Sequence, residues 1–142
     1  MSDLKIFLVD DDFYYLHILE QHLINLGCSN IQLFDNGPDC LDNLSEKPDI
    51  IFLDYQMDTL TGYEVLKKIK RFDPNIYVVM ISAQEQIKPV VDALKHGAFD
   101  YLQKGDHEPQ KLKDVLQRIK DVKQILESPA PGFLKKIFQF AL

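Results

Sequence analysis

The sequence predicts an α/β protein with a parallel, doubly wound β-sheet. Five apolar runs of strand length alternate with segments of helical periodicity, which is the pattern of successive βα units. The runs are rich in Ile, Val, Leu and Phe, and three show little polar alternation, as expected for strands buried on both faces. The chain of 142 residues is long enough for one domain with a sizeable core.

The expected strands and helices follow one another in strict alternation. The strands are expected at residues 4–9, 30–34, 50–53, 76–81 and 99–102. The helices are expected at residues 13–26, 39–45, 62–71, 86–95 and 112–126. Gly27 and Gly97 are natural ends for the first and fourth helices, and Pro48 and Pro74 lie just beyond the second and third.

Connection rules limit how these strands are arranged. Because crossovers between parallel strands are right-handed, five consecutive βα units favour a flavodoxin-like sheet with strand order 2-1-3-4-5 and five helices. Ligands of such sheets bind beyond the carboxyl ends of the strands, where the order reverses between the first and third strands. A functional site is therefore expected at this edge.

Composition and charge exclude several classes of function. With 46% hydrophobic and 27% charged residues, the chain is unlike disordered, collagen-like or polytopic membrane proteins. Its 16 basic and 22 acidic residues give a net charge of −6, so no direct nucleic-acid partner is expected. Cys28 and Cys40 form no C-x-x-C pair and are expected to be buried thiols in a reducing compartment. Because the sequence shows no secretory signal and no apolar stretch of about 20 residues, we expect a cytoplasmic protein.

Acidic residues follow the first and third expected strands. Asp10, Asp11 and Asp12 come directly after one, and Asp54 directly after the other, so their carboxylates should converge in one crevice. Like charges in such a crevice repel unless a cation joins them, and Mg²⁺ suits a site with few carboxylates. The alternative is that Asp10–Asp12 only caps the next helix. Capping describes Asp12 but does not explain Asp54, so we favour a metal site.

Two further polar residues follow the fourth and fifth expected strands. Ser82 places a hydroxyl at the same edge of the sheet, and Lys104 places an ammonium there. Three carboxylates, one Mg²⁺ and one lysine sum to a nearly neutral site. An incoming phosphoryl group would find a cation, an ammonium and a hydroxyl donor at this edge.

These residues belong to a set of motifs that resembles the response-regulator receiver domain, the phosphoacceptor module of two-component signalling. The resemblance covers residues 3 to about 126, which is most of the chain. The matching segments are IFLVDDD at 6–12, PDIIFLD at 48–54 with Met57 and Gly62 after it, ISA at 81–83, and GAFDYLQK at 97–104.

The resemblance implies a phosphoacceptor chemistry centred on Asp54. Asp54 would be the nucleophile that becomes an aspartyl phosphate, by self-catalysed phosphorylation and dephosphorylation rather than by turnover of a separate substrate. Asp10 and Asp11 would hold Mg²⁺ together with Asp54 and the backbone carbonyl of Gln56. A carboxylate that attacks phosphorus in line, beside a metal ion and a lysine, is consistent with known phosphoryl-transfer chemistry.

The resemblance also implies a response to the phosphoryl group. Ser82 would bond to the phosphoryl group after transfer, and Lys104 would pair with it. Tyr101 would be the aromatic residue whose rotamer follows Ser82. We further expect the amides of Gln56 and Gln84 to influence the attacking water and so to set the lifetime of the phosphoryl group.

Two positions depart from the family pattern. Asp58 stands where proline is common, and Gly105 follows Lys104 where the family usually has a proline after a cis peptide bond. Gly105 is compatible with a strained cis bond or with a trans bond and a displaced loop. The reach of Lys104 depends on which one forms. Tyr15, like most of the other tyrosines, is expected to be a partly buried packing residue.

The leading interpretation is a stand-alone response regulator. It would accept a phosphoryl group from a histidine kinase or a phosphotransfer protein and would signal to a downstream protein target by altered partner binding. The surface of the fourth helix, fifth strand and fifth helix would carry this output. The alternative is a degenerate receiver that acts as a phosphorylation-independent interaction module. A phosphatase-like hydrolase would need a second aspartate at position 56, which is glutamine.

The expected domain boundary lies near residue 127. Residues 1–127 would form the receiver domain, and residues 128–142 a linker with a short amphipathic tail. The tail could pack on its own domain, dock on a partner protein, contact a second copy in a homodimer, or bind a membrane surface. We favour a protein contact over a membrane, because two lysines and one short segment give little membrane affinity.

Overall fold

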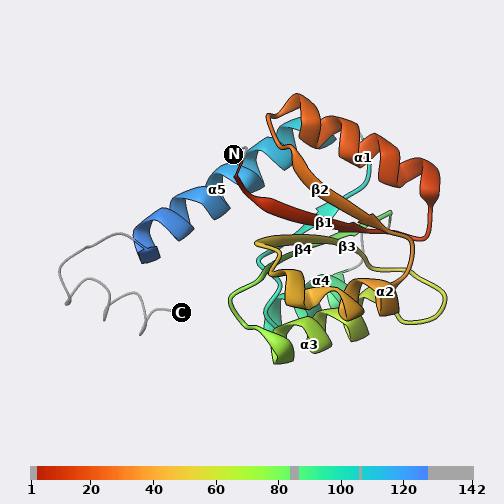
Figure 1. The fold of residues 1–142 in the computed structure, drawn as a ribbon. Coiled ribbons are helices and arrows are strands. Elements are labelled where there is room, and N and C mark those ends of the chain that lie inside the picture. The colour runs from red at the N-terminus through yellow and green to blue at the C-terminus, as the bar shows by residue number, and fades with distance from the viewer. Residues whose placement is uncertain (1–2, 84–86, 106, 128–142) are drawn as a thin grey trace.

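The computed structural model describes residues 3–83, 87–105 and 107–127, and its central feature is one parallel sheet. Within these residues the strand order is β2-β1-β3-β4-β5 (Figure 1). The strands are β1 (Lys5–Val9), β2 (Asn30–Phe34), β3 (Ile50–Asp54), β4 (Tyr77–Ser82) and β5 (Asp100–Gln103). The predicted flavodoxin-like strand order is confirmed, and each strand differs from its predicted bounds by no more than one residue at either end.

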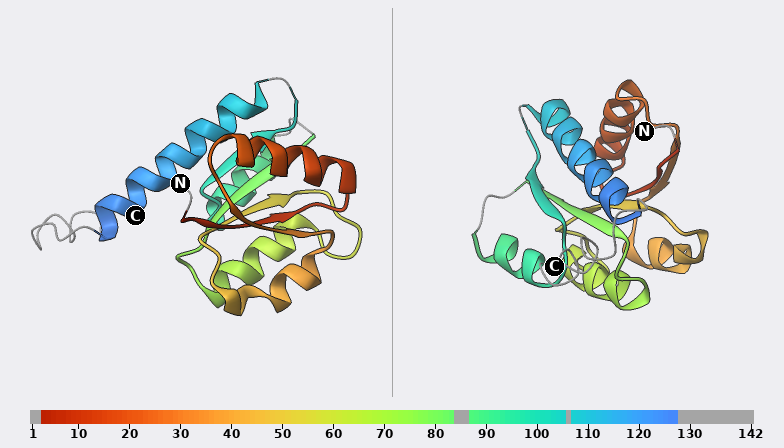
Figure 2. Two further views of the ribbon diagram at one scale, coloured as in Figure 1. Left: turned by 45° about the horizontal axis from the view of Figure 1, so that its top comes forward. Right: turned by 90° about the vertical axis from the view of Figure 1, so that its left-hand side faces the viewer.

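The helices cover the sheet on both faces. They are α1 (Phe13–Asn25), α2 (Gly37–Asp42), α3 (Gly62–Phe72), α4 (Ile87–Lys95) and α5 (Glu108–Glu127), with a short 3₁₀ turn, η1 (Leu44–Glu46), after α2. α1 and α5 lie on one face, and α2, α3 and α4 lie on the other (Figure 2). The five predicted helices are therefore all present, and the sheet is doubly wound as expected.

Two apolar layers hold these helices on the sheet. On one face Leu16 and Leu23 of α1 meet Leu116 of α5, and on the other Leu66 and Ile69 of α3 fill the corresponding layer. All five side chains are almost completely buried. Burial of an aliphatic side chain of this size contributes about 1.5–3 kcal/mol. The central strands contribute side chains to both layers and are thereby fixed in place.

Three helix boundaries differ from the sequence prediction by more than one residue. α2 begins at Gly37 rather than at residue 39, because the side chain of Asn36 accepts a hydrogen bond from the backbone of Asp39 and caps the helix. The segment predicted as one helix over 39–45 is instead α2 followed by η1. α5 begins at Glu108 rather than at residue 112, with Pro109 in its first turn, where the missing N–H carries no cost. The predicted linker and tail, 128–142, lie outside the described residues.

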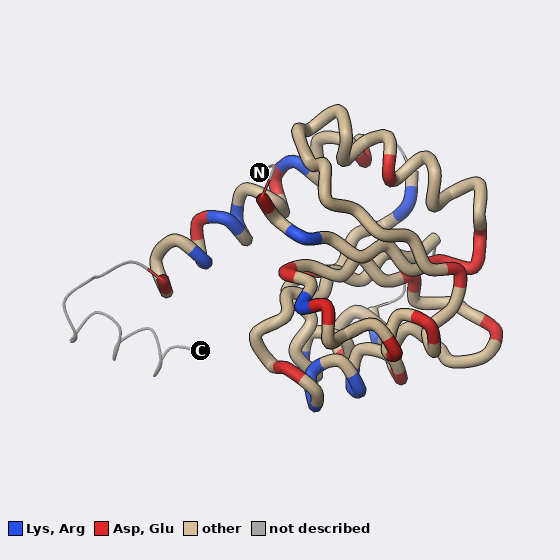
Figure 3. Tube along the Cα trace, in the orientation of Figure 1, with Lys and Arg blue, Asp and Glu red and all other residues tan. Residues whose placement is uncertain are grey.

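The fold brings acidic positions together at one edge of the sheet. Acidic residues gather where β1 ends and α1 begins, while basic residues are frequent on α3 and α5 (Figure 3). The N-cap of α1 is Asp12, whose carboxylate accepts a hydrogen bond from the Tyr15 backbone N–H, so its predicted capping role is confirmed.

None of the described helices has the length and hydropathy needed to cross a bilayer.

Candidate phosphoacceptor site

Strand register places two of the predicted carboxylates beside each other. Val9 of β1 pairs with Leu53 of β3, so Asp10 and Asp54, one residue further along each strand, emerge side by side at the carboxyl edge. The backbone N–H of Asp10 donates to the carbonyl of Phe34 at 3.1 Å, which extends the sheet by one residue. Asp10 is therefore held by the sheet and not by a loop.

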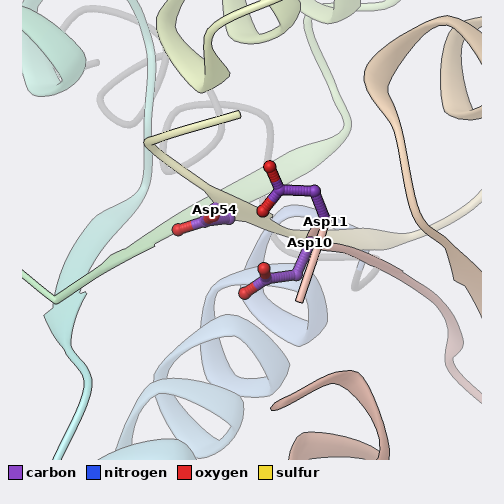
Figure 4. Close-up of side chains that lie close together, drawn as sticks. All are labelled: Asp10, Asp11 and Asp54. Atoms are coloured by element: carbon purple, nitrogen blue, oxygen red, sulfur yellow. The ribbon is translucent and has the colours of Figure 1, made fainter. Parts of the chain in front are cut away.

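The three predicted metal-binding carboxylates converge. One carboxylate oxygen from each of Asp10, Asp11 and Asp54 lies within 4.8 Å of the others (Figure 4). Asp10 and Asp54 are buried, and Asp11 is exposed to solvent. Hard oxygen donors at this separation, open to water on one side, fit Mg²⁺, which keeps several water ligands in protein sites.

The electrostatics of the cluster also fit a cation. Burial, and then the charge of Asp10, raise the pKa of Asp54 from 3.8 to about 7, although the Lys104 ammonium acts in the opposite direction. The pKa of Asp11 is raised by partial burial and by the charges of Asp10 and Asp58. The cluster thus holds more negative charge than its own lysine neutralises. Asp58, a departure from the family pattern, adds to this excess.

Lys104 reaches the acidic cluster from β5. Its Nζ lies 2.7 Å from Oδ2 of Asp10 and 3.5 Å from Oδ1 of Asp54. Its backbone N–H donates to the carbonyl of Ser82 at 2.8 Å, which continues the β4–β5 pairing. The Lys104–Gly105 peptide bond is trans, and Gly105 has φ +142°, a value that side chains disfavour. Of the two geometries compatible with the sequence, the trans bond forms, and the lysine still reaches the site.

Ser82 and Tyr101 also lie together. Ser82 ends β4 and is buried, and Tyr101 is partly buried on the neighbouring strand. Burial raises the pKa of the Tyr101 hydroxyl, and a hydrogen bond with Ser82 lowers it. The ring of Tyr55, which follows Asp54, lies 6.4 Å from that of Tyr101, centroid to centroid. The two residues expected to respond to a phosphoryl group are thus in contact.

The structure describes only one of the two glutamines named in the sequence analysis. Gln56 lies in the loop after β3 and is exposed, and the role of its carbonyl as a ligand stays a prediction. Gln84 lies outside the described residues.

Sequence reasoning missed the part that three residues, Gly62, Tyr15 and Glu108, play in shaping the site. A Cβ on Gly62 would lie 2.2 Å from the carbonyl oxygen of Asp54, so the start of α3 can pack against Asp54 only because position 62 is glycine. The ring of Tyr15 lies under the Lys104 ammonium, and the Tyr15 hydroxyl donates to Glu108 at the start of α5. Gly62 was at least part of a recognised motif, whereas nothing in the local sequence marks Tyr15 or Glu108.

Comparison with known proteins decides the family. A family model, the response regulator receiver domain, matches residues 6–119. The chain belongs to this family. Receiver domains typically use Mg²⁺ at an acidic site and interact with histidine kinases or phosphotransfer proteins, so the chain is a receiver domain of two-component signalling with an acidic cluster compatible with Mg²⁺.

Similar receivers occur in proteins of different length. The chain is 39% identical over 102 residues to the transcriptional regulatory protein ZraR of Klebsiella oxytoca, a match that covers 71% of this chain and 23% of ZraR. It is 28% identical over 116 residues to the chemotaxis protein CheY of Thermotoga maritima, which covers 81% of this chain and 96% of CheY. The chain thus spans about a quarter of ZraR but nearly all of CheY.

A solved structure agrees with this assignment. A response regulator receiver domain protein from Clostridium thermocellum superposes with a TM-score of 0.79 at 25% identity. The match covers 87% of this chain and 98% of that one, so the whole sheet with its helices is shared.

Proposed function

We propose that this receiver accepts a phosphoryl group from a phosphohistidine donor onto Asp54 in a Mg²⁺-dependent reaction. The observation that carries the proposal is the convergence of Asp10, Asp11 and Asp54 with Lys104 at one edge of the sheet. The donor would be a histidine kinase or a phosphotransfer protein. The receiver would act as a single-domain regulator in the cytoplasm.

Each residue of the site has a defined part in the transfer. An oxygen of Asp54 attacks phosphorus in line; the P–O bond forms as the P–N bond to the donor imidazole breaks, and the leaving nitrogen keeps the electron pair and takes up a proton. Asp10, Asp11, Asp54 and the carbonyl of Gln56 would hold Mg²⁺, which supplies positive charge beside the phosphoryl oxygens.

Lys104 and Ser82 act on the transferred group. The ammonium of Lys104 already lies 3.5 Å from Asp54 and can pair with a phosphoryl oxygen on that carboxylate. Ser82 donates its hydroxyl to the same group. Its engagement would alter the hydrogen bond with Tyr101, and so couple the acceptor to β5. The amides of Gln56 and Gln84 would influence the water that later removes the phosphoryl group.

The output would pass to a protein bound near β5. α4 presents an apolar stripe to solvent, formed by Ile87, Val91 and Leu94, whose exposed fractions are 83%, 40% and 47%. These residues lie on one side of the helix, at positions i, i+4 and i+7. A downstream target or a second copy of the chain would bind this side with an affinity that depends on Ser82 and Tyr101.

The test is direct phosphorylation by a small-molecule donor. The protein is incubated with phosphoramidate and Mg²⁺, and its intact mass is recorded beside that of the Asp54→Asn variant and of a sample with EDTA. We expect one phosphoryl adduct that requires both Mg²⁺ and Asp54. Absence of the adduct, together with absence of Mg²⁺ binding in calorimetry, would overturn the proposal in favour of a phosphorylation-independent interaction module.

A further inference from the structure

Tyr15 and Glu108 lie outside the acidic cluster. Tyr15 contacts Lys104, and Glu108 contacts Tyr15. The Nζ of Lys104 lies 4.1 Å from the centroid of the Tyr15 ring, which comes from the first turn of α1. The hydroxyl of Tyr15 donates a hydrogen bond to Oε1 of Glu108, the first residue of α5. Glu108 is buried, although it is charged and lies at the start of a helix. Three elements, α1, β5 and α5, are therefore joined beside the acceptor.

The position of the Lys104 ammonium decides whether it can pair with a phosphoryl group on Asp54. Lys104 has a flexible four-carbon stem, yet its Nζ must stay within reach of both Asp10 and Asp54. Besides its two carboxylate partners, the ammonium has an attractive surface in the face of the Tyr15 ring, since the quadrupole of an aromatic ring attracts a cation over its face.

Glu108 fixes the ring in turn. Its carboxylate accepts the Tyr15 hydroxyl and thereby orients the phenol, and a hydrogen-bonded phenol is also richer in electrons and a better partner for an ammonium. Burial raises the pKa of Glu108, and a hydrogen bond from the backbone N–H of Gly105 opposes that shift. A proline at position 105, as receivers usually have, would lack this N–H. The departure from the family pattern therefore provides a second link from Glu108 to the segment that carries Lys104.

We infer that Tyr15, oriented by Glu108, holds the Lys104 ammonium in place for phosphoryl transfer to Asp54. The inference rests on the proposed function of Asp54. Tyr15 and Glu108 touch neither the phosphoryl group nor the carboxylate that accepts it, and they act through Lys104. They are positioning residues.

The first test measures phosphorylation rates. The rate constant with phosphoramidate at saturating Mg²⁺ is determined for three variants. Tyr15→Leu removes the ring, Tyr15→Phe keeps the ring but removes the hydrogen bond to Glu108, and Glu108→Gln weakens that bond by replacing a charged acceptor with a neutral one. We expect a loss of about tenfold for Tyr15→Leu and about threefold for the other two. Tyr14→Leu and Asp114→Asn are matched controls on exposed positions of the same helices and should react at the wild-type rate.

A double-variant cycle separates positioning from general damage. If Tyr15 acts through Lys104, Tyr15→Leu should slow the reaction in the wild-type background and have no further effect in a Lys104→Ala background. An equal loss in both backgrounds would overturn the inference, and so would wild-type rates in all three single variants. If thermal denaturation shows that Tyr15→Leu is not folded at the temperature of the assay, the rates of Tyr15→Phe and Glu108→Gln decide the question.

The second test needs no phosphoryl transfer. The Cε of Lys104 is bonded to the Nζ that lies 4.1 Å from the centroid of the Tyr15 ring, so the ring current should move the NMR signals of the Cε protons upfield in the wild type. Tyr15→Leu should abolish this shift and Glu108→Gln should reduce it. An unchanged shift in both Tyr15→Phe, which has no hydroxyl to donate, and Glu108→Gln would refute the role of Glu108 even in a protein that phosphoramidate does not modify. Failure of the wild type to form an adduct would instead count against the proposed function.

Discussion

The stability of this receiver should depend on pH through Asp54, and the Asp54→Asn variant isolates that dependence. Asp54 is 6% exposed, and the pKa of its carboxyl is raised from 3.8 to about 7, mainly by burial and then by the charge of Asp10. Between these two values the folded protein binds a proton that the unfolded chain has released. Stability without a divalent cation must therefore fall as the pH rises from about 4 to about 7.

The magnitude follows from the two pKa values. At pH 5 the bound proton favours the folded state by about 3 kcal/mol, and at pH 8 its contribution has almost vanished. The free energy of unfolding of the wild type, relative to Asp54→Asn, should therefore fall by about 2–3 kcal/mol between these pH values. Groups away from the acidic cluster titrate alike in both proteins, so their contributions cancel in this difference.

Urea denaturation in EDTA provides the measurement. Unfolding of both proteins is followed by circular dichroism at pH 5 and pH 8, and the two differences in free energy are compared. At pH 8, Mg²⁺ should restore stability to the wild type but not to Asp54→Asn. A difference between the proteins that stays constant within about 0.5 kcal/mol from pH 5 to pH 8 would show that Asp54 ionises near its ordinary pKa, and the account of excess negative charge at the site would be wrong.

Two further predictions concern the loop that packs α3 against the acceptor. Gly62→Ala places a Cβ 2.2 Å from the backbone oxygen of Asp54, so the free energy of unfolding should fall by about 2 kcal/mol; an unchanged urea midpoint would show that the loop yields without cost. Thr61→Ala removes the capping box that Thr61 forms with Glu64 and should cost about 1 kcal/mol, seen as a melting temperature lower by a few degrees. A variant as stable as the wild type would mean that solvent caps α3 equally well.

Most of the fold could be predicted because its signals are local. Apolar runs ended at recognisable polar residues, and the right-handed crossover rule then left little freedom in the strand order. The two misplaced helix starts share one feature, a proline in the first turn. Pro38 and Pro109 lie within the first turns of α2 and α5, where a missing N–H is harmless.

The site was predictable to the extent that topology determines it. Asp10 and Lys104 directly follow a strand and Asp54 ends one, and parallel strands that end at one edge bring such residues together whatever the loops do. The link between Tyr15 and Glu108 joins residues 93 positions apart through side chains on two helices. Neither strand order nor periodicity determines how two helix ends meet, so only the three-dimensional structure reveals this contact.

The positions of Asp54 and Lys104 in the sheet have a consequence for how the proposed reactivity of Asp54 varies with time. Asp54 ends β3, a strand whose five residues are all buried between β1 and β4, whereas Lys104 follows β5, which lies at the border of the sheet. Border strands open more readily than central ones in native-state fluctuations. A transient opening of β5 would withdraw the ammonium while the carboxylates keep their arrangement. Under the proposed function, Asp54 and the ammonium that neutralises it thus lie on strands that open at different frequencies, and phosphorylation of Asp54 would stop during an opening of β5 while the core stays intact.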